Sequence, residues 1–295
     1  NRRRSKGWIS NNWKEYELLD ATEGFRLESW AGKLLVRPDP QVIWATERAD
    51  PRWSRFDAKY HRSSTGGGRW EIRNLPESWL LHYADWLTFH VKPMNFKHTG
   101  VFPEQAANWD YIRRKVEGAG RPVRVLNLFA YSGGATLAAA AGGAEVWHVD
   151  AAKGMVAMAR ENAAASGLAG RPVHWIVDDC GKFIQREIRR GRKYDGIVMD
   201  PPSYGRGPSG EIWKMERDFY PFLLTVREIL SDRPLFVLIN SYTTGLAPSV
   251  VAYLADSVFG PRFGGRTQCG ELGLPVTASG LTLPCGATGR WEPGP

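Results

Sequence analysis

Five short apolar runs, separated by segments of helix length, are the feature that most constrains the fold of this chain. They lie at residues 123–128, 145–149, 173–177, 194–199 and 235–239. Such runs are typical of parallel strands that are buried on both faces and joined by helical crossovers. Helices are predicted at residues 135–141, 153–166, 181–190, 217–230 and 248–259. With a terminal hairpin over residues 267–285, the pattern predicts a doubly wound α/β fold with a mostly parallel, seven-stranded sheet.

The amino-terminal part of the chain has a different pattern. From residue 16 to about residue 91 the strand-like runs are short and broken by turn signals. We therefore predict a small β-rich accessory domain at residues 1–93 and the main domain at residues 94–295. Tryptophans alternate with arginines in the first part, which would suit base stacking and phosphate contacts. In a sheet this small, however, most of these rings are expected in the core.

The composition and charge of the chain limit its possible partners and its cellular environment. The formal charge is +8, and residues 1–14 hold five basic residues and no acidic one, which favours a polyanionic partner. The three cysteines have no C-x-x-C spacing, so we expect no metal site and a reducing, cytoplasmic environment. Since no apolar run could span a bilayer, we expect no membrane partner. The first residue is not Met, which indicates a trimmed start and leaves room for an upstream module.

A ligand of such a sheet binds beyond the carboxyl ends of the strands. The first strand runs into Asn-Leu-Phe-Ala-Tyr-Ser-Gly-Gly at residues 127–134, where two glycines would let the backbone approach a ligand. A dinucleotide loop needs G-x-G-x-x-G to hold a pyrophosphate. Phe129 and Tyr131 occupy the places of those glycines, which argues against NAD and for a smaller ligand.

Acidic residues follow the next two strands. Asp150 ends the second strand, where a carboxylate can accept both hydroxyls of a ribose. Asp178 and Asp179 follow the third, where a carboxylate can receive an adenine amino group. Each acid alone could equally cap a helix. Together with the loop they predict an adenosine-binding sheet.

The fourth strand ends in Asp200-Pro201-Pro202-Ser203-Tyr204. The prolines fix the backbone and leave carbonyl oxygens as outward acceptors, and the tyrosine can stack on a planar ring. This suits methyl transfer to a base, where the protein mainly positions a nucleophilic atom and excludes water.

These motifs together resemble the RlmI and RlmK group of bacterial large-subunit ribosomal-RNA methyltransferases. Lys-His-Thr-Gly-Val-Phe-Pro-Glu-Gln at residues 97–105 resembles the segment that precedes the catalytic domain in that group and touches the cofactor. The resemblance implies an S-adenosyl-L-methionine cofactor and an RNA substrate, with ribosomal RNA as the expected one, while the group's RNA-binding module of the PUA type is absent from this sequence. The residues expected to bind the cofactor are Gln105, Asn127, Phe129, Ala130, Tyr131, Ser132, Gly133, Asp150, Ala151, Asp178, Asp179 and Cys180; those expected at the reacting centre are Asp200, Pro201, Pro202 and Tyr204.

One departure from the group bears on the chemistry. Its cytosine-5 members carry a nucleophilic cysteine after the fifth strand, where this chain reads Ile-Asn-Ser-Tyr-Thr-Thr-Gly at residues 239–245. Without that thiolate a covalent intermediate is unsupported. We therefore expect the target to be a guanine ring nitrogen or an exocyclic amine, with Cys180 lining the cofactor pocket or packing as a small apolar residue.

Three other functions remain open from the sequence. A methyltransferase for a protein or a small molecule would use the same cofactor site. An NAD(P)-dependent oxidoreductase shares the fold, although the loop argues against it. A non-catalytic RNA-binding module would keep the sheet without the reaction. The sequence leaves the oligomeric state open.

Overall fold

The computed structural model describes residues 8–207 and 209–295 and divides them into two compact units. Unit 1 comprises Trp8, residues 107–272 and residues 285–295; unit 2 comprises residues 9–106 and 273–284. None of the helices in these residues combines the length and the apolar character needed to cross a bilayer. The boundary at residue 93 between an accessory domain and the main domain stays a prediction.

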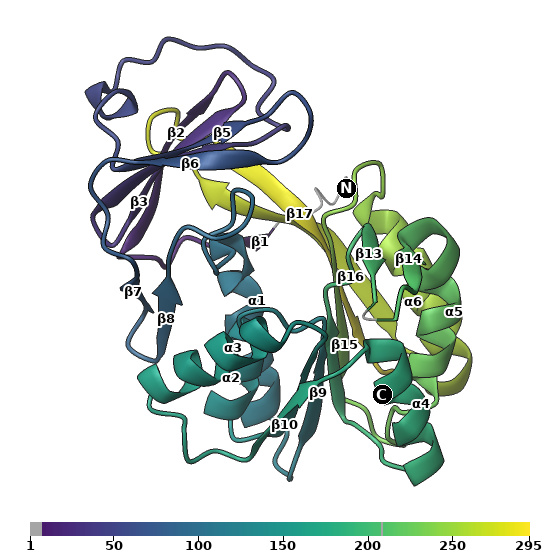
Figure 1. Ribbon diagram of the computed structural model, residues 1–295. Coiled ribbons are helices and arrows are strands. Elements are labelled where there is room, and N and C mark those ends of the chain that lie inside the picture. The colour runs from purple at the N-terminus through teal and green to yellow at the C-terminus, as the bar shows by residue number, and fades with distance from the viewer. Residues whose placement is uncertain (1–7, 208) are drawn as a thin grey trace. The chain divides into compact units, whose positions relative to one another are not determined.

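A central parallel sheet organises unit 1 (Figure 1). Its parallel strands are β9 (Arg124–Leu128), β10 (Glu145–Asp150), β11 (Val173–Val177), β12 (Gly196–Met199) and β15 (Phe236–Ser241). In order across the sheet they run β15-β12-β9-β10-β11, with all neighbours parallel. The strands β9, β12 and β15 are almost wholly buried, as their continuous apolar sequences require. The predicted fold class is confirmed.

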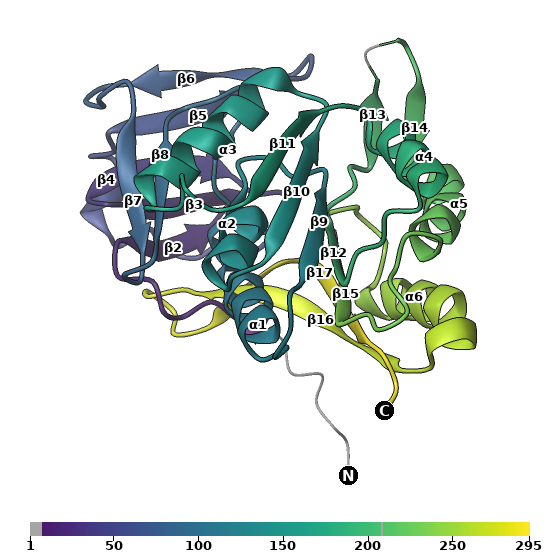
Figure 2. The same ribbon diagram turned by 90° about the horizontal axis from the view of Figure 1, so that it is seen from below.

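Helices cover both faces of this sheet. One face carries α1 (Ala106–Glu117), α2 (Gly134–Ala141) and α3 (Lys153–Ala165), and the other carries α4 (Cys180–Arg190), α5 (Met215–Arg227) and α6 (Pro248–Phe263) (Figure 2). A single apolar core lies between the sheet and the second group, and includes Phe183, Leu223, Ile239 and Phe259. Because these strands are parallel, the turns that follow β9, β10, β11 and β12 all lie at one edge of the sheet.

The carboxyl-terminal strands are β16 (Arg266–Pro275) and β17 (Thr282–Glu292), and β17 pairs antiparallel with β15. They form the terminal hairpin that the sequence predicts. The two-residue strand β1 (Trp8–Ile9) adds an eighth member at the edge, beyond the seven expected. A second hairpin, β13 (Tyr204–Arg206) with β14 (Ile212–Lys214), was not predicted and directly follows the Asp200 turn.

Unit 2 contains the expected small β structure. Its larger sheet consists of β2 (Tyr16–Thr22), β3 (Phe25–Trp30), β4 (Lys33–Pro38), β5 (Ala58–Arg62) and β6 (Gly68–Ile72). A separate ribbon pairs β7 (Trp79–Tyr83) with β8 (Leu87–Val91), and short 3-10 turns occupy η1 (Pro51–Trp53) and η2 (Pro103–Gln105).

Most of the tryptophan and arginine side chains of unit 2 serve its own structure. Trp30 is fully buried, and Trp53 nearly so. Arg37 forms a buried ion pair with Glu28, and Arg26 pairs with Asp39. This supports the core interpretation of the alternating tryptophans and arginines over the nucleic-acid one.

Candidate active site

The turn after β9 has an unusual backbone. Phe129 and Tyr131 have φ values of 54° and 51°, in the left-handed region that bulky residues rarely occupy. Such conformations are strained and persist where the surrounding structure enforces them, often at functional sites. The loop at residues 129–133 is therefore held in a specific shape before any ligand binds.

The two glycines of this turn are required by packing inside the protein. A Cβ atom on Gly133 would come within 2.9 Å of the Cβ of Ala159 in α3. One on Gly134 would come within 2.5 Å of the indole of Trp109 in α1. The glycines thus let two helices approach the loop. That they also let the backbone approach a ligand stays a prediction.

Asp150 braces the loop from the neighbouring strand. Its Oδ2 accepts a hydrogen bond from the Tyr131 N–H at 2.9 Å, and its Oδ1 accepts one from the Ala152 N–H, also at 2.9 Å. A carboxylate has about four lone-pair positions. Asp150 can therefore hold the loop and still accept hydrogen bonds from a ligand.

Asp178 and Asp179 each have a structural partner. The Asp178 carboxylate forms an ion pair with Arg186 in α4 and accepts from the Asp179 N–H at 2.9 Å. Asp179 is the N-cap of α4, since its Oδ1 accepts from the Lys182 N–H at 2.9 Å. The Asp178 N–H donates to the Asp150 carbonyl at 3.0 Å, so the ends of β10 and β11 lie side by side.

Cys180 lies beneath the loop and is buried. Its Sγ accepts a hydrogen bond from the Phe129 N–H at 3.3 Å. Burial raises the pKa of the Cys180 thiol well above its ordinary value, and the hydrogen bond from Phe129 opposes this only in part. The thiol is thus a packing element rather than a nucleophile.

Several predicted cofactor residues have little or no exposed surface. Asn127 is buried, and its Nδ2 donates to Thr136 Oγ1 at 3.0 Å. Ala130 and Ser132 are also buried. Ala151 is exposed at the end of β10. Gln105 lies in η2 of unit 2, and its role toward the loop stays a prediction.

The Asp200 turn begins next to the loop, because β12 pairs with β9 in a register that aligns Met199 with Leu128. One of its expected acceptors is already used: the Pro202 carbonyl accepts from Trp213 Nε1 at 2.7 Å. Ser203 Oγ lies 2.8 Å from Thr243 Oγ1, which connects the end of β12 to the segment after β15.

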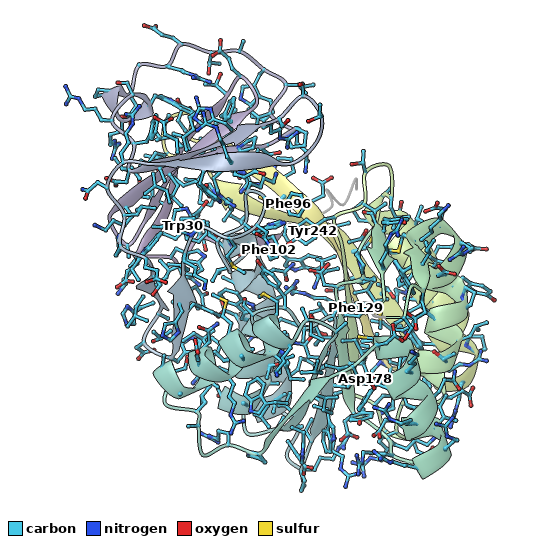
Figure 3. The ribbon with its side chains drawn as sticks, viewed as in Figure 1. Trp30, Phe96, Phe102, Phe129, Asp178 and Tyr242 are labelled. Atoms are coloured by element: carbon cyan, nitrogen blue, oxygen red, sulfur yellow. The ribbon has the colours of Figure 1, made fainter. Side chains whose placement is uncertain are left out.

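An aromatic cluster that the sequence did not reveal joins the loop to the β13–β14 hairpin. Trp213 of β14 lies 5.8 Å from Phe129 and 5.5 Å from Phe222 of α5, measured between ring centroids, and Phe129 lies 5.6 Å from Phe222. Figure 3 labels Phe129, Asp178 and Tyr242, which follow three different strands of unit 1. A Cβ on Gly286 would come within 2.7 Å of the Tyr242 ring, so Gly286 makes room for it.

Comparison with known proteins identifies this arrangement. Residues 44–248, more than half of the chain, match the family described as S-adenosylmethionine-dependent methyltransferase. The chain belongs to this family. The methyltransferase is 37% identical to the SAM-dependent methyltransferase from Agrobacterium tumefaciens, with a TM-score of 0.91 over 98% of this chain and 94% of that one. Membership supports a methyl-transferring enzyme over the oxidoreductase and the non-catalytic module.

The methyltransferase also has relatives whose names mention RNA. It is 31% identical over 155 residues to Ribosomal RNA large subunit methyltransferase K/L of Shewanella baltica (strain OS195), a match that covers 52% of this chain and 21% of the relative. The match thus spans about a fifth of that relative's length. The M. jannaschii tRNA m1G37 methyltransferase shares the fold at 10% identity, with a TM-score of 0.54 over 95% of this chain and 74% of that one.

The donor and acceptor chemistry of the site fits S-adenosylmethionine. The ribose hydroxyls and the adenine amino group of this cofactor are hydrogen-bond donors, and the carboxylates of Asp150, Asp178 and Asp179 are acceptors at adjacent strand ends. When bound, the cofactor supplies a methyl group already activated on a sulfonium sulfur. The protein is left to orient both reactants and to exclude water.

Proposed function

We propose that the methyltransferase modifies a nucleotide base in RNA, with ribosomal RNA as the first candidate. The observation that carries this proposal is the Asp200 turn, which starts beside the cofactor loop and ends in Tyr204, whose side chain is 51% exposed. An exposed ring next to a methyl donor suits stacking on a planar base. The ribosomal-RNA methyltransferases among the relatives and the charge of +8 support RNA as the polymer.

In this proposal the cofactor lies across the ends of β9, β10 and β11. Asp150 accepts from the ribose hydroxyls, and Asp178 or Asp179 accepts from the adenine amino group. The backbone of residues 129–133 and the exposed Ala151 border the cofactor, with Cys180 supporting the loop from below. Gln105 stays a cofactor residue predicted from the sequence.

The reacting centre follows from the same geometry. Asp200 and the Pro201 carbonyl accept hydrogen bonds from the target amine and orient its lone pair, while Tyr204 stacks on the base. The target is a guanine ring nitrogen or an exocyclic amine. At the end of β15, Ser241 is buried and its Oγ accepts from the Thr243 N–H, so it offers no nucleophile to a pyrimidine carbon. The free cysteines at residues 180, 269 and 285 support a cytoplasmic location.

A transfer assay tests the proposal. Purified enzyme is incubated with S-adenosylmethionine labelled on the methyl group and with total RNA or total protein from cells that lack the gene. We expect label in RNA that ribonuclease releases and protease does not, and labelling about 100-fold slower with the Asp200→Ala variant. Label in protein alone, or in a small molecule alone, would replace RNA with another substrate class.

A further inference from the structure

The β13–β14 hairpin presents two different faces. Its register aligns Tyr204 with Lys214, Gly205 with Trp213, and Arg206 with Ile212. Because successive residues of a strand project to opposite faces, Gly205 and Trp213 share one face. The other four residues form what we call the outer hairpin face: Tyr204, Arg206, Ile212 and Lys214.

The inner face fixes the hairpin to unit 1. Trp213 packs on Phe129 and Phe222 and donates its Nε1–H to the Pro202 carbonyl. A Cβ on Gly205 would lie 3.4 Å from the Pro202 ring, so this side also faces the turn. At the open end of the hairpin, where α5 begins, the Lys214 N–H donates to Asp218 Oδ2 at 2.8 Å. The outer hairpin face is therefore held at a set position beside the Asp200 turn.

The outer hairpin face is exposed and positively charged. Tyr204 and Ile212 expose 51% and 43% of their surfaces, and Arg206 and Lys214 are exposed as well. The nearby acids have other partners: Glu211 pairs with Lys182 of α4 at 2.7 Å. Asp218 pairs with Arg217 at 2.8 Å.

The two outer cations have no ion-pair partner. Within residues 8–207 and 209–295, neither Arg206 nor Lys214 forms an ion pair. Lys214 pairs directly with Tyr204 across the hairpin. The Cβ atoms of such antiparallel partners are typically about 4.5–5.5 Å apart. An exposed aromatic ring beside two exposed cations that form no ion pair matches the composition of surfaces that bind single-stranded nucleic acid, where bases stack and phosphates contact Lys or Arg.

We propose that the outer hairpin face binds the single-stranded RNA segment that carries the target nucleotide. Arg206 and Lys214 contact the phosphates on either side of that nucleotide, and Tyr204 supports its base. This inference rests on the proposed RNA substrate and adds the element that holds the strand (Figure 1).

Salt-dependent binding tests the inference. The probe is a fluorescein-labelled, single-stranded RNA of mixed sequence and about 20 nucleotides. Its affinity is measured by anisotropy over a series of salt concentrations for the wild type, for Arg206→Gln/Lys214→Gln, and for Arg160→Gln/Arg171→Gln. The control pair lies in and after α3, is exposed and removes the same charge from unit 1. Binding of S-adenosylhomocysteine to each variant confirms an intact fold.

The slope of log K against log salt is negative. In the hairpin variant we expect its magnitude to be smaller by about 1.4, since each phosphate contact on a single strand contributes about 0.7. The control variant should keep the slope of the wild type. Equal slopes for the wild type and the hairpin variant, or an equal loss in the control, would overturn the inference while leaving an RNA substrate standing. A wild-type protein that binds no RNA would overturn the proposed function and this inference together.

Discussion

The backbone N–H of Tyr131 donates a hydrogen bond to the Asp150 carboxylate at 2.9 Å. The contact joins the turn after β9 to the end of β10, two elements that both border the proposed cofactor site. Asp150 thus has two roles in the proposed site, since it would accept from the ribose and it holds Tyr131 in its left-handed conformation.

Replacing Asp150 by Ala removes both actions. We expect binding of S-adenosylhomocysteine to weaken by about 1–3 kcal/mol, the usual cost of losing a hydrogen bond to a charged group. Asp150→Asn retains one acceptor oxygen and should lose less. Calorimetric titration measures both variants. If a folded Asp150→Ala protein binds the cofactor product as tightly as the wild type, Asp150 is only a structural brace.

The cysteines should be dispensable. Burial raises the pKa of the Cys180 thiol and that of the Cys269 thiol above their ordinary values, so neither is activated as a thiolate. A triple variant with serine at residues 180, 269 and 285 should retain methyl transfer within a few-fold, as measured with labelled cofactor. If the triple variant is inactive and the wild-type protein forms a covalent complex with RNA containing 5-fluorocytosine, the target is instead a pyrimidine carbon.

Two substitutions should separate substrate binding from cofactor binding. Tyr204→Leu removes a stacking ring worth about 1–3 kcal/mol per base and should raise KM for RNA. Asp200→Ala misplaces the target atom and should lower kcat by about 100-fold. Calorimetry should give wild-type affinity for S-adenosylhomocysteine in both. A parallel loss of cofactor affinity would place these residues in the cofactor site.

His148 should make the enzyme sensitive to acid. Burial lowers its pKa from 6.5 to about 3, and within the described residues its Nε2 has no hydrogen-bond partner. The unfolded chain therefore binds a proton below pH 6.5 that the folded chain does not, and the free energy of unfolding falls as the pH falls. Between pH 8 and pH 5 this one group should cost about 2 kcal/mol.

Denaturant unfolding of the wild type and His148→Gln at several pH values measures this effect. Gln can still hydrogen-bond to Thr136, which lies 2.8 Å from His148 Nδ1, but it takes up no proton. The variant should lose less stability than the wild type over this pH range, whatever its stability at pH 8. Parallel pH profiles would show that His148 is protonated in the folded state or does not control acid stability.

The sequence predicted the sheet well because its signal is local. The apolar runs from residue 123 to residue 239 became β9, β10, β11, β12 and β15 to within a few residues. The roles of individual side chains were harder to predict, because they depend on partners far along the chain. The glycines at residues 133 and 134 lie in the turn after β9, as predicted. Their packing against Ala159 and Trp109 could not be predicted from the sequence of the loop, because those partners lie in other helices.

The β13–β14 hairpin shows why prediction failed beside the site. Its strands have three residues each, too few for an alternating pattern to be recognised. The hairpin is stabilised by Trp213, whose partner Phe129 is separated from it in sequence by three helices and four strands. The same tertiary contact takes the Pro202 carbonyl that the sequence had assigned to the substrate.

Nucleoside mass spectrometry of RNA from cells with and without the gene tests the central claim most directly. The claim is that this enzyme methylates a base nitrogen in RNA without a covalent enzyme intermediate. We predict that deletion removes a single methylated nucleoside, with the methyl group on a guanine ring nitrogen or an exocyclic amine, and that the Asp200→Ala gene does not restore it. An unchanged nucleoside profile would contradict the RNA substrate, and the loss of 5-methylcytidine would contradict the proposed chemistry.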